Sequence, residues 1–296
     1  MEGQAGSNSS GIGSEQNLEN NLRLRVACGV LYSKAKKVHF LGFTFSILLA
    51  LISVIAIYFF KYIGNTLGII GTIWILVSRI VLQPWCEKLK LSGALAQEEF
   101  DCSVLDLEWN ETLPSKLSPE EVLSASLDRS TEKFQNWYPE VDAKWPQNIL
   151  IAQRSNNYWS KSLNRRYRRL QIVLILAIVM TGILICSFRH EQLSTYLVAI
   201  LLPSIPSLLD LSDMARSFGV TAQDHLRVEA RIERQLSSLS SVSKEDLRQN
   251  QDRIFLMRCQ GPLVPDSFYT FLREEFERLM QFAARQIKSI STNKTS

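Results

Sequence analysis

The residues best suited to chemistry lie in one polar stretch, residues 153–169, directly before an apolar run. They combine amide, aromatic and guanidinium groups: Gln153, Arg154, Asn156, Trp159, Arg165 and Arg166. A guanidinium holds a phosphate through two parallel hydrogen bonds, an indole ring stacks on a base, and an amide pairs with a base edge. These residue types therefore favour binding of a phosphorylated small ligand. The alternative is that the basic residues anchor the neighbouring apolar run to anionic lipid, at about 1 kcal/mol for each basic residue.

The rest of the sequence offers little for catalysis or metal binding. Its three histidines, His39, His190 and His225, are far apart and lack the spacing of metal ligands. No signature of a zinc protease, a serine hydrolase, a P-loop or a dinucleotide-binding loop occurs. The five cysteines are odd in number and no two are two residues apart, which favours a reducing compartment over a disulfide framework or a zinc site. We therefore expect a protein that is not an enzyme and that holds no cofactor or metal.

Four apolar runs divide the chain. Residues 40–60 and 170–188 contain no charged residue, and at 1.5 Å per residue each is long enough to cross a hydrocarbon core of about 30 Å. Residues 63–82 and 193–211 are weaker runs that follow them after very short connections. A short connection forces the chain to return antiparallel, so the pattern predicts four transmembrane helices in two hairpins. The mean hydropathy is near zero because polar blocks separate these runs.

Basic residues are concentrated on one side of the apolar runs. Clusters precede the first and the third run, whereas each hairpin tip carries a single basic residue, Lys61 or Arg189. Cytoplasmic loops of membrane proteins are enriched in Lys and Arg, so both termini and residues 83–169 are expected in the cytoplasm. The protein is therefore expected to be a multi-pass protein of the cell membrane. The net charge of +4 is too small to indicate a nucleic acid polymer as a partner.

The polar segments have helical character and show no strand pattern. Ser118 with Glu121, and Ser243 with Asp246, match the capping box that starts a helix, and Gly261 before a proline ends one. The expected fold is an all-α membrane protein, with four transmembrane helices as two hairpins plus cytoplasmic helical segments. The expected parts are a cytoplasmic tail with a disordered first part (1–39), transmembrane hairpin 1 (40–82) and a cytoplasmic helical domain (83–169). Transmembrane hairpin 2 (170–211) and a C-terminal cytoplasmic helical domain (212–296) follow.

Four residues within or beside the apolar runs are candidates for gating: Arg79, Pro203, Pro206 and Asp210. Arg79 lies near the cytoplasmic end of its run, where it either snorkels to lipid headgroups or lines a conduction path. The two prolines kink a helix, either for packing or as a hinge. Asp210 marks either the membrane boundary or an ion site. Two short hairpins are too few for a typical transporter core, so a permeation path would require several copies of the chain.

Several motifs follow one another in a distinctive order: EEFDCSVLDLEWN, NWYPEV, QRSNNYWSKSLNRRY and LRQNQDRIFLMRCQGPLVPDSFY. Over residues 17–284 this order resembles the SMODS-associated four-transmembrane effector family. The most specific pieces are residues 153–156 with 165–167, and Gln251 and Asp252 with 264–269. The resemblance thus adds Gln251 and Asp252 to the candidate ligand residues. Ser160 follows Trp159 where the family pattern has an aspartate, so the role of that carboxylate does not carry over.

The resemblance implies an effector of a bacterial anti-phage system based on cyclic oligonucleotide signalling (CBASS). A cognate nucleotidyltransferase would make a cyclic nucleotide, and the effector would bind it, oligomerise and disrupt the inner membrane, which causes abortive infection. The implied partners are this cyclic nucleotide, membrane lipid and further copies of the chain. The alternative is a non-conducting membrane anchor or adaptor whose cytoplasmic helices recruit partner proteins.

Overall fold

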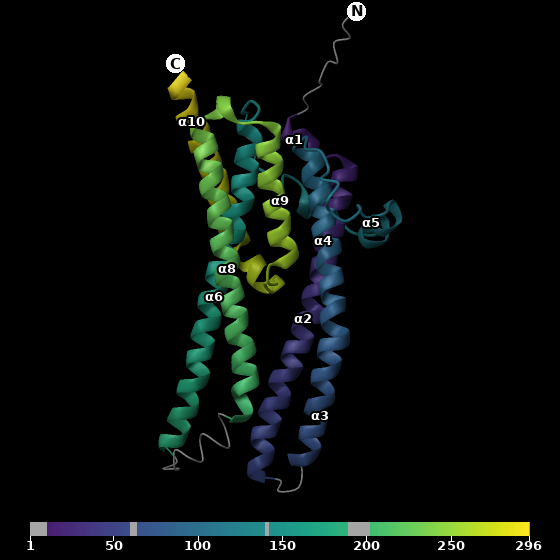
Figure 1. The fold of residues 1–296 in the computed structure, drawn as a ribbon, viewed down its shortest axis with the longest axis vertical. Coiled ribbons are helices and arrows are strands. Elements are labelled where there is room, and N and C mark those ends of the chain that lie inside the picture. Colours follow the sequence, from purple (N-terminus) through teal and green to yellow (C-terminus); the bar gives the residue numbers. More distant parts are fainter. Residues whose placement is uncertain (1–10, 60–63, 140–141, 189–201, 296) are drawn as a thin grey trace, which may run out of the picture.

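Two long helical hairpins form the frame of the molecule (Figure 1). The computed structural model describes residues 11–59, 64–139, 142–188 and 202–295, and over these residues the chain is helical and contains no strand. This confirms the all-α prediction. In one hairpin, α2 (Glu19–Phe59) packs antiparallel to α3 (Gly64–Val77), the π-helical turn η1 (Ser78–Leu82) and α4 (Gln83–Val104). In the other, α6 (Gln147–Phe188) packs antiparallel to α8 (Leu202–Ser237).

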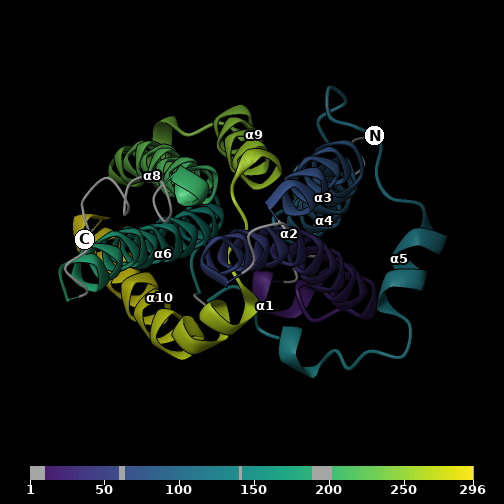
Figure 2. The ribbon, with the colours of Figure 1, turned by 90° about the horizontal axis from the view of Figure 1, so that it is seen from below.

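The remaining helices gather around one half of this frame, the upper half in Figure 1. α9 (Lys244–Gln260) lies between α8 and α4, α10 (Asp266–Thr295) lies along α6, and α5 (Pro119–Ser126) lies against α2, as Figure 2 shows from below. Three short elements complete this half: α1 (Ile12–Glu15), η2 (Glu132–Phe134) and η4 (Leu239–Ser241). The polar helices therefore form a head on top of two protruding hairpins.

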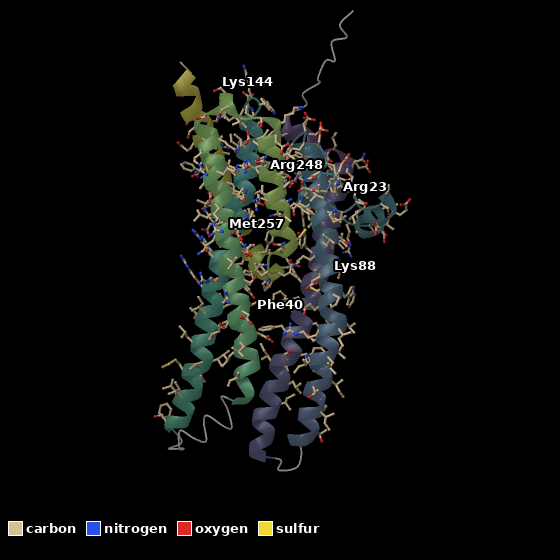
Figure 3. All side chains as sticks on the ribbon, in the orientation of Figure 1. Arg23, Phe40, Lys88, Lys144, Arg248 and Met257 are labelled. Carbon is tan, nitrogen blue, oxygen red and sulfur yellow. The ribbon has the colours of Figure 1, made fainter. Side chains whose placement is uncertain are left out.

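The lower half consists of the ends of α2, α3, α6 and α8 and presents apolar side chains on its outside. Exposed large side chains here include Ile69, Ile73, Ile80, Val173 and Leu176. In Figure 3, Phe40 marks the lower half on α2, whereas Arg248 lies well above it, where nitrogen and oxygen tips are dense. Within the described residues, one helix, over Ile69–Val104, is long and apolar enough to cross a membrane.

Several sequence expectations fall outside the described residues. They concern residues 1–10 of the tail, the hairpin tips with Lys61 and Arg189, and residues 193–201 of the fourth apolar run. The next part of the tail forms α1, and Ile12 packs against the core. Each expected boundary between a membrane segment and a cytoplasmic segment falls inside a helix or at a helical junction, because α2, α6 and α8 run from the head into the lower half.

Both capping boxes expected from the sequence are present. The N–H of Glu121 donates to the Ser118 hydroxyl (3.2 Å) at the start of α5, and the N–H of Asp246 donates to the Ser243 hydroxyl (3.1 Å) at the start of α9. Each box satisfies N–H groups that the first helical turn leaves without an intrahelical partner. α9 ends at Gln260, directly before the predicted glycine stop.

The main apolar core lies in the head, where α4, α6, α8 and α9 meet. Phe100, Leu150, Ile232, Leu247 and Ile254 are at most 1% exposed and belong to one cluster. Burying a side chain of this size contributes roughly 1.5–3 kcal/mol. This core fixes the relative positions of the four helices, and therefore of the polar side chains between them.

Candidate functional site

The candidate ligand residues between 153 and 166 all lie on α6, but they face three different neighbours. Gln153 faces α9, Arg154 faces α8, and Trp159 with Arg166 faces α10. Successive residues of a helix diverge by about 100°, so a sequence cluster does not become a spatial cluster automatically. The structure brings Gln153 and Gln251 together and distributes the other candidates over separate contacts.

Gln153 and Gln251 meet in the buried space between α6 and α9. Nε2 of Gln153 donates to the Leu247 carbonyl (2.9 Å) and to Oε1 of Gln251 (3.4 Å). Nε2 of Gln251 donates in turn to Oε2 of Glu98 (2.9 Å) and to Oδ2 of Asp101 (2.8 Å). The two amides are thus used within the protein, where they connect α6, α9 and α4.

A group of charged residues continues this network between α4 and α9, and we call it the α4–α9 clamp: Glu98, Asp101, Arg248 and Arg258. Glu98 pairs with Arg248 and lies 3.5 Å from Arg258, whose Nη2 lies 2.6 Å from Oδ2 of Asp101. The hydroxyl of Tyr138 donates to Oδ1 of Asp101 (2.7 Å). Two carboxylates therefore face two guanidiniums in a buried space.

Burial dominates the electrostatics of the clamp. It raises the pKa of the Glu98 carboxyl, against the opposing effect of the Arg258 charge, and it raises the pKa of the Tyr138 hydroxyl well above its usual value. Buried charges are tolerated when they are paired and hydrogen-bonded, and they are costly when they are not. The clamp holds α9 on α4, and a ligand would have to break it to reach these groups.

Asp252 lies at the edge of the clamp. Its Oδ1 lies 2.8 Å from Nη2 of Arg248, and its Oδ2 accepts a hydrogen bond from Nδ2 of Asn110 (2.9 Å). The clamp itself was not anticipated from the sequence. The available signal was a pair of acidic residues, Glu98 and Asp101, three positions apart and hence on one face of a helix.

A second polar row joins α6 to α8. Nη2 of Arg154 donates to Oε1 of Glu233 (2.8 Å) and lies 3.5 Å from Oε1 of Glu229. Lys161 also pairs with Glu229. The guanidinium of Arg154, a candidate phosphate ligand, is therefore held by two carboxylates of α8.

His225 lies in the same row and is buried. Its Nδ1 lies 2.9 Å from Oδ1 of Asn157. Burial lowers the pKa of His225 to about 3, with further contributions from the positive charges of Arg258 and Lys161. The ring is therefore neutral at physiological pH and acts as a packed, hydrogen-bonded core residue.

Trp159 and Arg166 form the contact between α6 and α10, which we call the α6–α10 contact. The Trp159 ring centroid lies 5.4 Å from the centroids of both Tyr269 and Phe276. Arg166 binds the Glu275 carboxylate with both terminal nitrogens, one at 2.7 Å, and its guanidinium carbon lies 5.0 Å from the Phe276 ring centroid. The hydrogen bond to Glu275 raises the pKa of Arg166, and it lowers the pKa of the Glu275 carboxyl.

Asn156 and Arg165 are candidate ligand residues whose side chains have polar groups without a partner among the described residues. Nδ2 of Asn156 is buried and has no hydrogen-bond partner among the described residues. Arg165 is exposed and forms no ion pair with any residue that the structure describes. Arg165 therefore needs no exchange of partner before it binds a ligand, whereas the Asn156 amide nitrogen lies inside the protein.

The candidate gating residues lie on different hairpins. Arg79 is exposed in the turn η1, where its Nη1 donates to Oε1 of Gln83 (3.4 Å). Pro203, Pro206 and Asp210 lie in the first described turns of α8, and Asp210 is exposed. A π-helical turn frequently marks a functional position in a helix, which keeps Arg79 of interest.

The part of the chain that the structure describes contains no candidate metal site. No group of His, Cys, Asp and Glu side chains is arranged there to hold a metal ion. Cys28, Cys86, Cys102 and Cys259 are free thiols. The expectation of a protein without a metal or cofactor stays a prediction.

Comparison with known proteins places the chain in a family. The family model for the SMODS-associating 4TM effector domain matches residues 10–287. A similar curated protein, a probable CBASS effector molecule of Bacillus cereus (strain VD146), is 29% identical over 303 residues, which cover 93% of this chain and 97% of that relative. No solved structure matches the chain. Because the family model covers nearly the whole sequence, the protein belongs to the SMODS-associating 4TM effector family.

Proposed function

We propose that this protein is the membrane effector of an anti-phage signalling system, and that a cyclic nucleotide triggers it to oligomerise and disrupt the inner membrane. The match of the family model over residues 10–287 carries the proposal. The name of the Bacillus cereus relative, a probable CBASS effector molecule, supports it. The outcome for the infected cell would be abortive infection, in which it dies before phage mature.

The helical frame suggests how a ligand signal would reach the membrane. α6 carries Arg154 and Arg165 in the head and continues to Phe188, and α8 continues from the head to Leu202 in the same way. The two hairpins are proposed to supply four membrane spans, with both termini in the cytoplasm. A ligand that binds the head more tightly in one arrangement of α6 would therefore shift the membrane arrangement as well.

The proposed ligand site centres on α6 beside the membrane boundary. Arg165 would bind a phosphate of the nucleotide with a guanidinium that forms no ion pair among the described residues. Arg166, the next residue along α6, would join it when a phosphate replaces the carboxylate of Glu275, because a guanidinium binds both anions with the same geometry, whereas Arg154 faces α8 about 16 Å further along the helix. The buried amides of Gln153 and Gln251 would then position α6 and not touch the ligand.

The test is dye release from liposomes that contain the purified full-length protein. A panel of cyclic di- and trinucleotides is added one at a time, and we expect release with one nucleotide and none without it. Arg165→Ala should lower the response at least tenfold, whereas Lys144→Ala, an exposed charge at the far end of the head in Figure 3, should respond as wild type. The nucleotide should be recovered unchanged, as expected of a protein that is not an enzyme.

The alternative function is a membrane adaptor that recruits partners and does not conduct. The observation that favours it is the outer face of α10, where Phe271 is 81% exposed and Phe282 is 64% exposed. Exposed aromatic residues on one face mark an interaction surface, for another protein or for a further copy of the chain. Silence across the nucleotide panel, with membrane insertion verified, would support the adaptor and contradict the effector proposal.

A further inference from the structure

A surface hollow of about 350 Å³ lies between α6 and α8, on the side where the head meets the hairpins. Arg168 and Arg216 line it together with Ile172, Ile175 and Val220, and no acidic residue lines it. Both arginines are exposed, and neither forms an ion pair with a residue that the structure describes. The hollow therefore has an apolar wall and two free positive charges.

Gly219 gives the Arg168 guanidinium its place in this hollow. A Cβ atom at position 219 would lie 2.9 Å from Cζ and Nη1 of Arg168 and 3.0 Å from its Nε. Such distances are shorter than van der Waals contact, so any side chain other than that of glycine would displace the guanidinium. Glycine in the middle of a helix costs about 1 kcal/mol relative to alanine, which makes its presence in α8 informative.

The position of the hollow along the helices indicates what kind of molecule it accepts. Ile172 and Ile175 belong to the third apolar run, whereas Arg168 precedes that run on the head side. Ser212 and Ala215, on the opposite wall, directly follow the fourth apolar run. An occupant would therefore place an anionic group at the membrane surface and an apolar part beside the membrane segment.

The charges around the hollow are asymmetric. An adjoining hollow of about 340 Å³ shares Arg216 and Val220 but is also lined by Asp213 and Asp224. These carboxylates would repel an anion, so the anionic group belongs on the side of Arg168. A guanidinium and a phosphate form two charge-assisted hydrogen bonds, which fits this side.

We infer that the hollow between α6 and α8 binds the phosphate headgroup of an anionic phospholipid, with Arg168 and Arg216 on the phosphate and Ile172 and Ile175 along an acyl chain. The inference rests on the membrane placement in the proposed function, and it adds a lipid site separate from the nucleotide site. A free nucleotide shares the phosphate chemistry, but it has no apolar part to match the isoleucine wall. The hollow also lacks an aromatic ring for a base, since its lining contains none.

The test uses the full-length protein in mild detergent, titrated with short-chain phosphatidylglycerol or with zwitterionic phosphatidylcholine. Lipid adducts are counted by native mass spectrometry, and thermal unfolding is followed in parallel. We expect phosphatidylglycerol to bind preferentially, and Arg168→Gln and Arg216→Gln each to weaken it about fivefold. Gly219→Ala should also weaken it several-fold although both arginines remain, because the new Cβ displaces the Arg168 guanidinium.

Arg169→Gln is the matched control, because it removes the same charge from the neighbouring position of α6 and does not line the hollow. It should change binding by less than twofold. An equal loss in Arg168→Gln and Arg169→Gln, or equal binding of the two lipids, would overturn the site. Displacement of phosphatidylglycerol by a cyclic nucleotide would overturn it as well, in favour of a nucleotide pocket. Neither the count of lipid adducts nor thermal unfolding requires dye release. A failure of the effector proposal would therefore be distinguishable from a failure of the lipid site.

Discussion

The head is held together by two polar contacts of opposite character, the α4–α9 clamp and the α6–α10 contact. In the clamp, the Glu98 side chain is 0% exposed and the Arg258 side chain is 8% exposed. In the α6–α10 contact, the Arg166 side chain is 38% exposed and the Glu275 side chain is 49% exposed. The same kind of carboxylate–guanidinium pair is therefore buried in the clamp and solvent-exposed in the α6–α10 contact.

This difference predicts which helix the proposed ligand would displace. Removing one partner of a buried ion pair leaves a charge without compensation, whereas an exposed pair exchanges its partner for water at little cost. We therefore regard α9 as fixed to α4, and α10 as a helix that a competing anion can release from α6. The aromatic contacts of Trp159 with Tyr269 and Phe276, and of Tyr167 with Phe268, remain between α6 and α10.

The largest expected effect comes from breaking the clamp. Arg258→Met removes the partner of Asp101 and leaves that buried carboxylate without its guanidinium. We expect a loss of about 3–5 kcal/mol in the free energy of unfolding, a large share of the roughly 5–15 kcal/mol that holds a domain folded. Thermal unfolding of the detergent-solubilised protein measures it.

A second substitution separates lost charge balance from lost packing. Asp101→Asn in the Arg258→Met background removes the uncompensated charge and should recover part of the stability. The double variant could instead lose as much unfolding free energy as the two single variants, Arg258→Met and Asp101→Asn, lose in sum. That result would show that the clamp does not act through its charges, and it would contradict the contrast between the fixed α9 and the releasable α10.

The next effect concerns the amide that connects the clamp to α6. Gln153→Leu leaves Oε1 of Gln251 without its donor and removes one donor from the Leu247 carbonyl, whereas Nε2 of Gln251 keeps Glu98 and Asp101. A buried polar group without a partner costs about 1–3 kcal/mol, so a loss of this size is expected in thermal unfolding. Gln249→Leu on the exposed side of α9 is the control and should change stability little. A neutral Gln153→Leu variant would mean that the amide is free for a ligand after all.

Gln153 also shows where sequence reasoning reached its limit. The helices, their caps and the two hairpins follow from local patterns, such as Ser118 with Glu121, because those interactions join residues a few positions apart. The role of Gln153 depends on residues about a hundred positions away, and its residue type suits base recognition as well as burial. Arg25 belongs to the basic cluster that precedes the first apolar run, yet it is 4% exposed and its guanidinium carbon lies 3.6 Å from the Trp137 ring centroid.

The candidate site was predictable only in part for the same reason. Arg165 is exposed beside the third apolar run, as expected of a polar stretch next to such a run. The carboxylates that hold Arg154 and Arg166 lie on α8 and α10, and no local spacing connects them to α6. Long-range pairing decides whether a guanidinium is available to a ligand, and a single sequence does not contain that pairing in readable form.

A smaller effect is expected from pH, through the second polar row. His225 is neutral in the folded chain because its pKa is lowered to about 3, whereas the unfolded chain binds a proton below about pH 6.5. Stability is therefore complete above pH 6.5 and falls as the pH drops from there towards 3, by at most about 1.4 kcal/mol per pH unit. His225→Gln should remove most of the slope between pH 6.5 and 5.5 in thermal unfolding. An unchanged slope would mean that the ring titrates normally and is not buried.

The smallest effect on stability, and the sharpest test of the contrast, comes from the two sides of the exposed pair. Arg166→Ala and Glu275→Gln should each change the midpoint of thermal unfolding by about 2 °C or less, since solvent screens the pair. Their effects on activation should have opposite signs. Without Arg166 the nucleotide loses a group that binds its phosphate, so dye release should need a higher nucleotide concentration. Without the Glu275 carboxylate the Arg166 guanidinium is already free, so a lower nucleotide concentration should suffice. Equal shifts in the same direction would show that the pair only docks α10, and that α10 moves no more readily than α9.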